Sequence, residues 1–271
     1  MNNPTPSFSV KVDPTNPGQF FACCGLLELA DRLWPGTEGW FDENARQFHL
    51  WCGEHTLTEL VDAIAKAKLV HVDSADPYSS PIRVGAPFRE LDIDWWLLDQ
   101  TGARDLKVWA GTMESYGIAR AMQHAIRDPK FLSADLLQIG MVVTNPDDPS
   151  KKKEPFYFDA RRSPNAHSLD VGFSANDLGL TSTAHPAVEL LCLIGIQVAR
   201  PSFTSQKRIY DYSLWSVPLT ANLLLAASTG AIELPGAQTH RFENWFRTGQ
   251  KKHKAFRSAV PISPSQTGDQ Q

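Results

Sequence analysis

The first 34 residues carry two hydrophobic patterns in succession, which predict a strand followed by a buried helix. Residues Ser7 to Val12 alternate polar and apolar side chains, as in a strand with one buried face. The Pro/Gly-containing segment Asp13 to Gly18 ends that strand. From Gln19 to Trp34 the residues are apolar on nearly every side, so we expect this helix to pack against more than one neighbour.

The next segment predicts a hairpin, a helix and a further strand. Gly39 to Phe41 and Gln47 to Trp51 are short apolar runs separated by a polar turn. Thr56 and Glu59 have the spacing of a capping box, and apolar residues then recur at helical intervals before Leu69 to Val72 becomes extended. The order β-α-β-β-α-β predicts an α+β protein with a ferredoxin-like core.

The segment between Phe88 and Ile126 predicts a hairpin followed by a helix. Phe88 to Leu98 and Asp105 to Ala110 predict a second hairpin, and Met113 to Ile126 predicts a helix. In the first of these strands, alternation places Asp92 and Asp94 on one face, opposite the apolar side chains.

The second half of the chain predicts another α+β unit. Its main elements are a nearly all-apolar helix from Pro186 to Val198, an alternating segment from Gln206 to Trp215, a short helix from Leu219 to Ala227, and a basic hairpin from Thr239 to Ile262. The predicted organisation is an N-terminal ferredoxin-like half over 1–144, an exposed linker loop over 145–155, a C-terminal half over 156–262 and a disordered tail over 263–271.

The composition is typical of a globular protein that does not span a membrane. A chain of 271 residues with 42% hydrophobic and 21% charged residues is ordinary for a globular protein. No apolar run approaches the roughly 20 residues that span a bilayer, and the start has no signal-peptide pattern, so we expect a cytoplasmic protein without a membrane partner. The four cysteines lack metal-binding spacing and are expected to be buried apolar residues.

No catalytic motif is present, so an enzyme is not expected. The phosphate-binding, dinucleotide-binding, nucleophile-elbow, zinc-protease and calcium-loop patterns are all missing. His185 and Glu189 could share a helical face as metal ligands, although a capping histidine and a glutamate matched to the helix dipole explain them more simply. Asp92 and Asp94 could bind a metal with Asp99 or Asp105, although a solvated sheet face is the simpler interpretation. The sequence therefore predicts no catalytic residue, metal or cofactor.

Basic and aromatic residues cluster in the second half despite the net charge of -4. Dispersed positive charge suits phosphates, and flat rings suit unpaired bases. An alternative is a hairpin whose rings face the core and whose lysines face water. The predicted nucleic-acid-binding residues are Arg161, Arg162, Lys207, Arg208, Lys251, Lys252, Lys254 and Arg257 for phosphates, and Tyr210, Tyr212 and Trp245 for stacking.

Two segments carry a resemblance to a known family. Asp13 to Ala30 and His185 to Gly195 resemble a CRISPR-associated protein of the type I-G system, formerly called I-U or Dpsyc, namely the smaller protein encoded beside the backbone and processing subunits. The resemblance covers most of the chain and favours the ferredoxin-like (RAMP-like) fold. It offers no active-site motif, and Gln47 to Trp51 departs from the signature of ordinary RNA-recognition modules.

The resemblance implies a non-catalytic subunit of a CRISPR interference complex in antiviral defence. Its expected partners are guide RNA, target DNA and other effector subunits, and base pairing would read the sequence. Two alternatives remain open. One is an architectural subunit that binds only protein through the tryptophan-rich strand Phe88 to Leu98. The other is a metal-dependent nuclease that uses Asp92 and Asp94.

Overall fold

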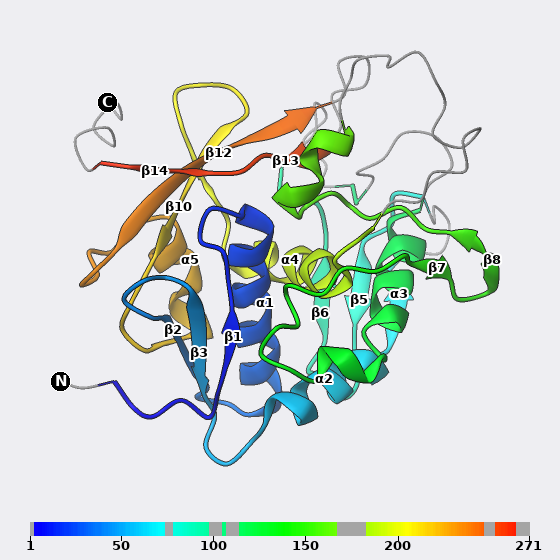
Figure 1. Ribbon diagram of the computed structural model, residues 1–271, viewed down its shortest axis with the longest axis horizontal. Coiled ribbons are helices and arrows are strands. Elements are labelled where there is room, and N and C mark those ends of the chain that lie inside the picture. Colours follow the sequence, from blue (N-terminus) through cyan, green and yellow to red (C-terminus); the bar gives the residue numbers. More distant parts are fainter. Residues whose placement is uncertain are drawn as a thin grey trace.

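Two nearly all-apolar helices pack against each other at the centre of the protein, and the other elements surround them (Figure 1). They are α1 (Pro17–Leu33) and α4 (Pro186–Val198). In α1 every residue from Pro17 to Ala30 is buried, and in α4 every residue from Pro186 to Ile196. The computed structural model describes residues 3–73, 78–97, 105–106, 114–166, 183–246 and 253–263.

Both central helices begin at a proline, which suits the first helical position because that position needs no N–H donor. At α1 the side chain of Asn16 accepts hydrogen bonds from the backbone nitrogens of Gly18 at 3.1 Å and Gln19 at 3.4 Å. These bonds satisfy donors that have no partner within the helix. The helix predicted from Pro186 to Val198 is confirmed at both ends, and α1 begins two residues before its predicted start.

Glycines allow the two helices to approach each other through their backbones. A Cβ atom on Gly195 would lie 2.6 Å from the backbone nitrogen of Gly25, and closer still to the carbonyl oxygen of Phe21. A Cβ atom on Gly25 would lie 3.0 Å from the carbonyl carbon of Leu191. Real Cβ atoms do not come so close to backbone atoms, so both positions require glycine.

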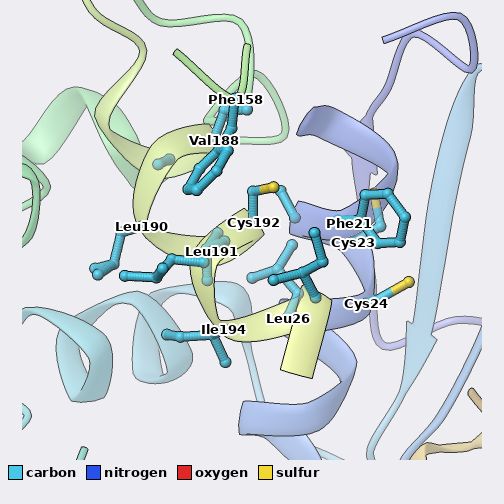
Figure 2. Close-up of a cluster of buried hydrophobic side chains, with 14 of the residues drawn as sticks. Phe21, Cys23, Cys24, Leu26, Phe158, Val188, Leu190, Leu191, Cys192 and Ile194 are labelled. Carbon is cyan, nitrogen blue, oxygen red and sulfur yellow. The ribbon is translucent and has the colours of Figure 1, made fainter. Parts of the chain in front are cut away.

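Side chains fill the remaining space around this crossing, as Figure 2 shows. The labelled residues are Phe21, Cys23, Cys24 and Leu26 of α1, Val188, Leu190, Leu191, Cys192 and Ile194 of α4, and Phe158. All four cysteines of the chain are unpaired and buried, which confirms that they serve as small apolar residues.

The first sheet follows the predicted order at its start and then departs from it. Its strands are β1 (Phe8–Lys11), β3 (Gln47–Trp51), β2 (Glu38–Phe41) and β11 (Leu219–Thr220), in that spatial order, and neighbouring strands are antiparallel. The arrangement β1-β3-β2 is that of a split β-α-β unit.

The expected closure of the ferredoxin-like core is not formed in the described sheets. In that fold the fourth strand would pair with β1, but β4 (Leu69–His71) pairs with β5 (Ile82–Val84), which pairs with β6 (Leu91–Ile93). The first sheet instead gains β11, from the second half of the chain, on its other edge. The fold is therefore mixed α+β with several small antiparallel sheets.

The C-terminal sheet is built on the long strand β12 (Gln238–Phe246). On one side β12 pairs with β10 (Ile209–Leu214), which pairs with β9 (Ser202–Phe203). On the other side β12 pairs with β13 (His253–Phe256) and β14 (Val260–Ile262), so the predicted basic hairpin consists of three strands.

Three shorter helices and a hairpin complete the described fold. The helices are α2 (Leu57–Lys66), α3 (Ser115–Ala125) and α5 (Leu224–Ser228), with 3-10 helices at Pro129–Phe131, Ala160–Ala166 and Ala221–Leu223. The predicted capping box of α2 is present at Thr56 and Glu59. The segment predicted as a linker loop forms a hairpin instead, from β7 (Thr144–Asn145) and β8 (Asp148–Lys152).

One hydrophobic core runs through both predicted halves of the chain. Trp215 of the second half donates its indole N–H to the carbonyl oxygen of Gly39 in the first half at 2.8 Å. The ring of Tyr212 stacks on Phe20 of α1 with a centroid distance of 4.4 Å. Among the described helices, none has the length and apolar character needed to cross a membrane.

The helix crossing makes the protein sensitive to a single added methyl group. We expect Gly195→Ala to lower the free energy of unfolding by about 3 kcal/mol, because the new Cβ overlaps backbone atoms that cannot move independently. Chemical denaturation measures this change. The matched control is Gly85→Ala, whose Cβ would meet its nearest atom at 3.8 Å. Equal stability of the two variants would contradict the close approach.

Candidate nucleic-acid interface

Two arginines lie over aromatic rings at the end of β12. The guanidinium carbon of Arg208 is 5.1 Å from the ring centroid of Phe246, and that of Arg257 is 4.6 Å from the ring centroid of Trp245. Both distances fit a cation–π interaction, which orients the planar guanidinium against the ring. We call Lys207, Arg208, Trp245, Phe246 and Arg257 the sheet-end cluster.

The local backbone determines how these side chains are presented. Arg208 has a positive φ of 69° just before β10, and its carbonyl oxygen accepts a hydrogen bond from Asn244 at 2.9 Å. The pairing of β12 with β13 shifts between Trp245 and Phe246, where Lys254 is the extra residue. A bulge of this kind turns the strand locally and redirects successive side chains.

The charges of the sheet-end cluster are partly neutralised. Arg257 forms an ion pair with Glu243 at 3.1 Å, and in the same sheet Arg241 binds Asp211 through two contacts of 2.8 Å. Lys207 and Arg208 are exposed and have no carboxylate partner among the residues that the structure describes. These two cations are therefore the most available for an external phosphate.

Two of the three predicted stacking residues are buried. Tyr212 has an exposed fraction of 0%, and its hydroxyl donates a hydrogen bond to the carbonyl oxygen of Pro14 at 2.6 Å. Tyr210 is 6% exposed and packs against Trp96 and Phe242. Neither ring offers a face to a base, so both belong to the core. Trp245 is half-buried and lies beneath Arg257.

Most of the remaining predicted phosphate ligands are engaged elsewhere. Lys254 is only 8% exposed. Arg161 contacts the buried carboxylate of Asp159 at 2.5 Å and donates to the carbonyl oxygen of Leu137 at 2.8 Å. Arg162 is half-buried, and two of its guanidinium nitrogens are buried without a partner in the described structure. Lys251 and Lys252 lie outside the described residues.

Phe246 is the residue of the sheet-end cluster that was not predicted. Strict alternation along β12 places it on the same face as the buried residues Phe242 and Asn244. The pairing with β13 shifts at this last residue, and Phe246 is half-buried and lies beneath Arg208. A bulge depends on the partner strand, so no signal in the sequence of β12 indicates it.

A buried polar cluster lies where α1 and α4 begin. Asp159 accepts hydrogen bonds from Asn16 at 2.8 Å and from Arg161 at 2.9 Å. Burial acts to raise the pKa of Asp159, but the hydrogen bonds and charge of Arg161 outweigh that effect and hold the pKa below its usual value. Asp159 is therefore ionised at neutral pH.

Glu189 belongs to the same cluster but, unlike Asp159, is mainly protonated at neutral pH. Its carboxyl group is fully buried and accepts hydrogen bonds from the backbone nitrogens of Phe158 at 3.2 Å and Asp159 at 3.1 Å. Burial, followed by the charge of Asp159, raises the pKa of Glu189 to about 8. The cluster ties the segment around Phe158 to the start of α4, which is a structural role.

The side chain of His185 does not cap α4. His185 precedes α4, but its side chain makes no capping hydrogen bond. Its Nδ1 atom is 3.3 Å from a carboxylate oxygen of Asp159, and burial lowers the pKa of the ring. Within the described residues no group of three His, Cys, Asp or Glu side chains is arranged to hold a metal ion.

Asp92 and Asp94, the other candidate metal ligands, also make contacts that stabilise the fold. Asp92 on β6 binds Arg83 on β5 through two hydrogen bonds of 2.6 and 2.8 Å, an arrangement that fits a cross-strand pair on a solvated face. The backbone of Asp94 bonds to the side chain of Gln197 on α4. Asp99, which was considered as a further ligand, lies outside the described residues.

No protein-family model matches this sequence, and no characterised protein or solved structure is significantly similar to it.

The protonated state of Glu189 predicts a pH dependence of stability. Its pKa is higher in the folded protein than in the unfolded chain, so its contribution is complete below pH 4.5 and is lost as the pH rises through about 8. We expect the free energy of unfolding to fall by about 1 kcal/mol between pH 7 and 8.5. Denaturant titrations at several pH values measure this slope.

A matched pair of variants isolates the effect. Glu189→Gln keeps the shape of the side chain and removes its titration, so the slope between pH 7 and 8.5 should flatten. Glu59→Gln changes an exposed glutamate whose pKa is lowered and should keep the slope of the unmodified protein. A slope that is unchanged in Glu189→Gln would show that Glu189 does not titrate in this range.

Proposed function

We propose that this protein is a non-catalytic subunit of a type I-G CRISPR interference complex and contacts nucleic acid through the sheet-end cluster. The observation that carries this proposal is the pair of arginines held over aromatic rings at the end of β12, beside Lys207, which has no carboxylate partner among the described residues. Guanidinium groups donate paired hydrogen bonds to phosphate, and a guanidinium held flat against a ring leaves its outer face for stacking of a base.

The location of the two resembling segments supports the assignment to this family. Asp13 to Ala30 contains the start and most of α1, and His185 to Gly195 contains most of α4. These segments are far apart in the sequence but form one tightly packed unit in the protein. The two segments that carry the resemblance therefore belong to the part of the sequence that determines the core, as expected for a shared fold.

The role proposed for the cluster is to hold a nucleic-acid backbone rather than to recognise a sequence. In RNA-guided complexes base pairing between guide and target supplies sequence recognition, and the protein binds backbone and shape. Lys207 and Arg208 would neutralise phosphates, and Arg257 would join them by exchanging Glu243 for a phosphate.

The two alternatives have less support. The architectural interpretation needs an exposed tryptophan-rich strand, but Trp95 and Trp96 are buried against the core. The nuclease interpretation needs carboxylates that are free to bind a metal, but Asp92 is paired with Arg83.

Purification of the tagged protein from its own cells tests the assignment. We expect it to carry CRISPR effector subunits together with RNA of uniform length, because a subunit of an assembled complex is recovered with its guide. Treatment of the extract with nuclease before capture separates contacts through RNA from contacts through protein. Recovery of neither effector subunits nor RNA would contradict the proposed function.

Charge reversal tests the sheet-end cluster directly. We expect Arg208→Glu combined with Arg257→Glu to weaken binding of a labelled single-stranded RNA by about tenfold, because two phosphate contacts are lost. The dependence of log affinity on log salt should become shallower by about 1.4. Fluorescence anisotropy across a salt series measures both quantities.

Arg89→Glu is the control for this pair, since it reverses an exposed arginine outside the cluster. Thermal melts establish that all variants are folded. If the double variant bound RNA as well as Arg89→Glu does, the sheet-end cluster would not be a nucleic-acid contact.

A further inference from the structure

A second basic surface lies on α3, and none of the predicted nucleic-acid-binding residues belongs to it. Two adjacent hollows, of about 420 and 220 Å³, run between α3 and the segment from Met141 to Pro146. His124 and Arg127 line both hollows, so the two are direct neighbours along the same face. We call this the α3 groove.

One wall of the α3 groove is cationic. Arg120, His124 and Arg127 are spaced by four and three residues, which places them on one face of the helix and of the turn that follows it. Lys153 extends this row, because its ammonium nitrogen would be only 3.0 Å from a Cβ atom on Gly117, one turn before Arg120. The absence of a side chain at Gly117 makes room for this lysine.

Part of this positive charge is not neutralised within the described structure. Arg120 binds Asp147 through contacts of 2.6 and 2.8 Å, and Asp128 binds Lys130 at 3.1 Å, so these two acids are paired. Arg127 has only a 3.3 Å hydrogen bond from its Nε atom to the carbonyl oxygen of Ala65. Neither Arg127 nor Lys153 has a carboxylate partner among the described residues.

The opposite wall is apolar and its backbone is already hydrogen-bonded. Val142 is 40% exposed, and Met141 and Pro146 also line the groove. Met141 pairs with Ala184 through two backbone bonds of 2.9 Å, and the carbonyl oxygen of Val143 accepts a bond from Lys153. These bonds leave few backbone groups with which an extended peptide could pair.

We propose that the α3 groove binds single-stranded nucleic acid. Phosphates lie along Lys153, Arg120 and Arg127, and unpaired bases lie against Val142 and Pro146. A row of cations beside an apolar wall matches the alternation of charged backbone and flat bases in a single strand, whereas the bases of a duplex are stacked inside it. The identity of the bound nucleic acid rests on the proposed function. That a single strand binds here is inferred from the side chains of the groove alone.

The first test compares charge reversals on the full-length protein. The probe is a fluorescently labelled twelve-nucleotide poly-uridine RNA, which has no secondary structure, and the readout is anisotropy across a salt series. We expect Arg127→Glu combined with Lys153→Glu to weaken binding by about tenfold and to reduce the salt slope by about 1.4. Arg89→Glu is the control, and circular dichroism establishes that each variant is folded.

Several outcomes would overturn the proposal. These outcomes are equal binding by the double variant and the control, no binding of the RNA at 50 mM salt, and binding of polyglutamate of equal charge in place of RNA. The last outcome would identify an acidic peptide as the occupant. Loss of binding only in the Arg208→Glu and Arg257→Glu variant would place the strand at the sheet-end cluster, and the proposed function would survive.

A crosslinking experiment tests the groove without any substitution in the protein. The RNA carries 4-thiouridine, and crosslinked peptides are identified by mass spectrometry after irradiation. We expect crosslinks in peptides that contain residues 141–146 and 120–127. Crosslinks confined to peptides from β12 and β13 would contradict binding in the α3 groove.

Discussion

The close approach of α1 and α4 at Gly25 and Gly195 is the constraint on which the rest of the structure depends. Because the backbones nearly touch there, the side chains on either side of the crossing interdigitate at a fixed rotation of one helix against the other. The first sheet packs near α1, and the C-terminal sheet reaches the same helix through Tyr212. A change in the crossing would displace both sheets, including the strand that carries the sheet-end cluster.

Sequence patterns predicted most individual elements but not how they associate. The alternation before Asp13 and the all-apolar run after it are local properties, and they placed β1 and α1 within two residues. The addition of β11 to the first sheet depends on contacts between distant segments, and β4 pairs with the next strand, β5, and not with β1. The segment predicted as a linker forms β7 and β8, because a chain rich in polar residues and proline can still pair with itself at the surface.

The functional residues were harder to predict, because residue type does not reveal a partner. The aromatic residues of an alternating strand can face either side, and in β10 Tyr210 and Tyr212 face the core. Likewise, Arg161 is held by the buried Asp159, whereas Arg127 and Lys153 lie in unremarkable sequence and have no acidic partner among the described residues. Only the three-dimensional arrangement separates cations that stabilise the fold from cations available to a ligand.

The long separation of α1 and α4 in the chain also affects how the protein is made. During synthesis α1 leaves the ribosome about 165 residues before α4 is complete, which at ordinary translation rates corresponds to roughly 8 to 33 seconds. Throughout that interval a helix whose surface is almost entirely apolar lacks its main packing partner. The apolar surface of α1 is therefore exposed to aggregation until α4 is made, and slow decoding before residue 198 would lengthen that exposure.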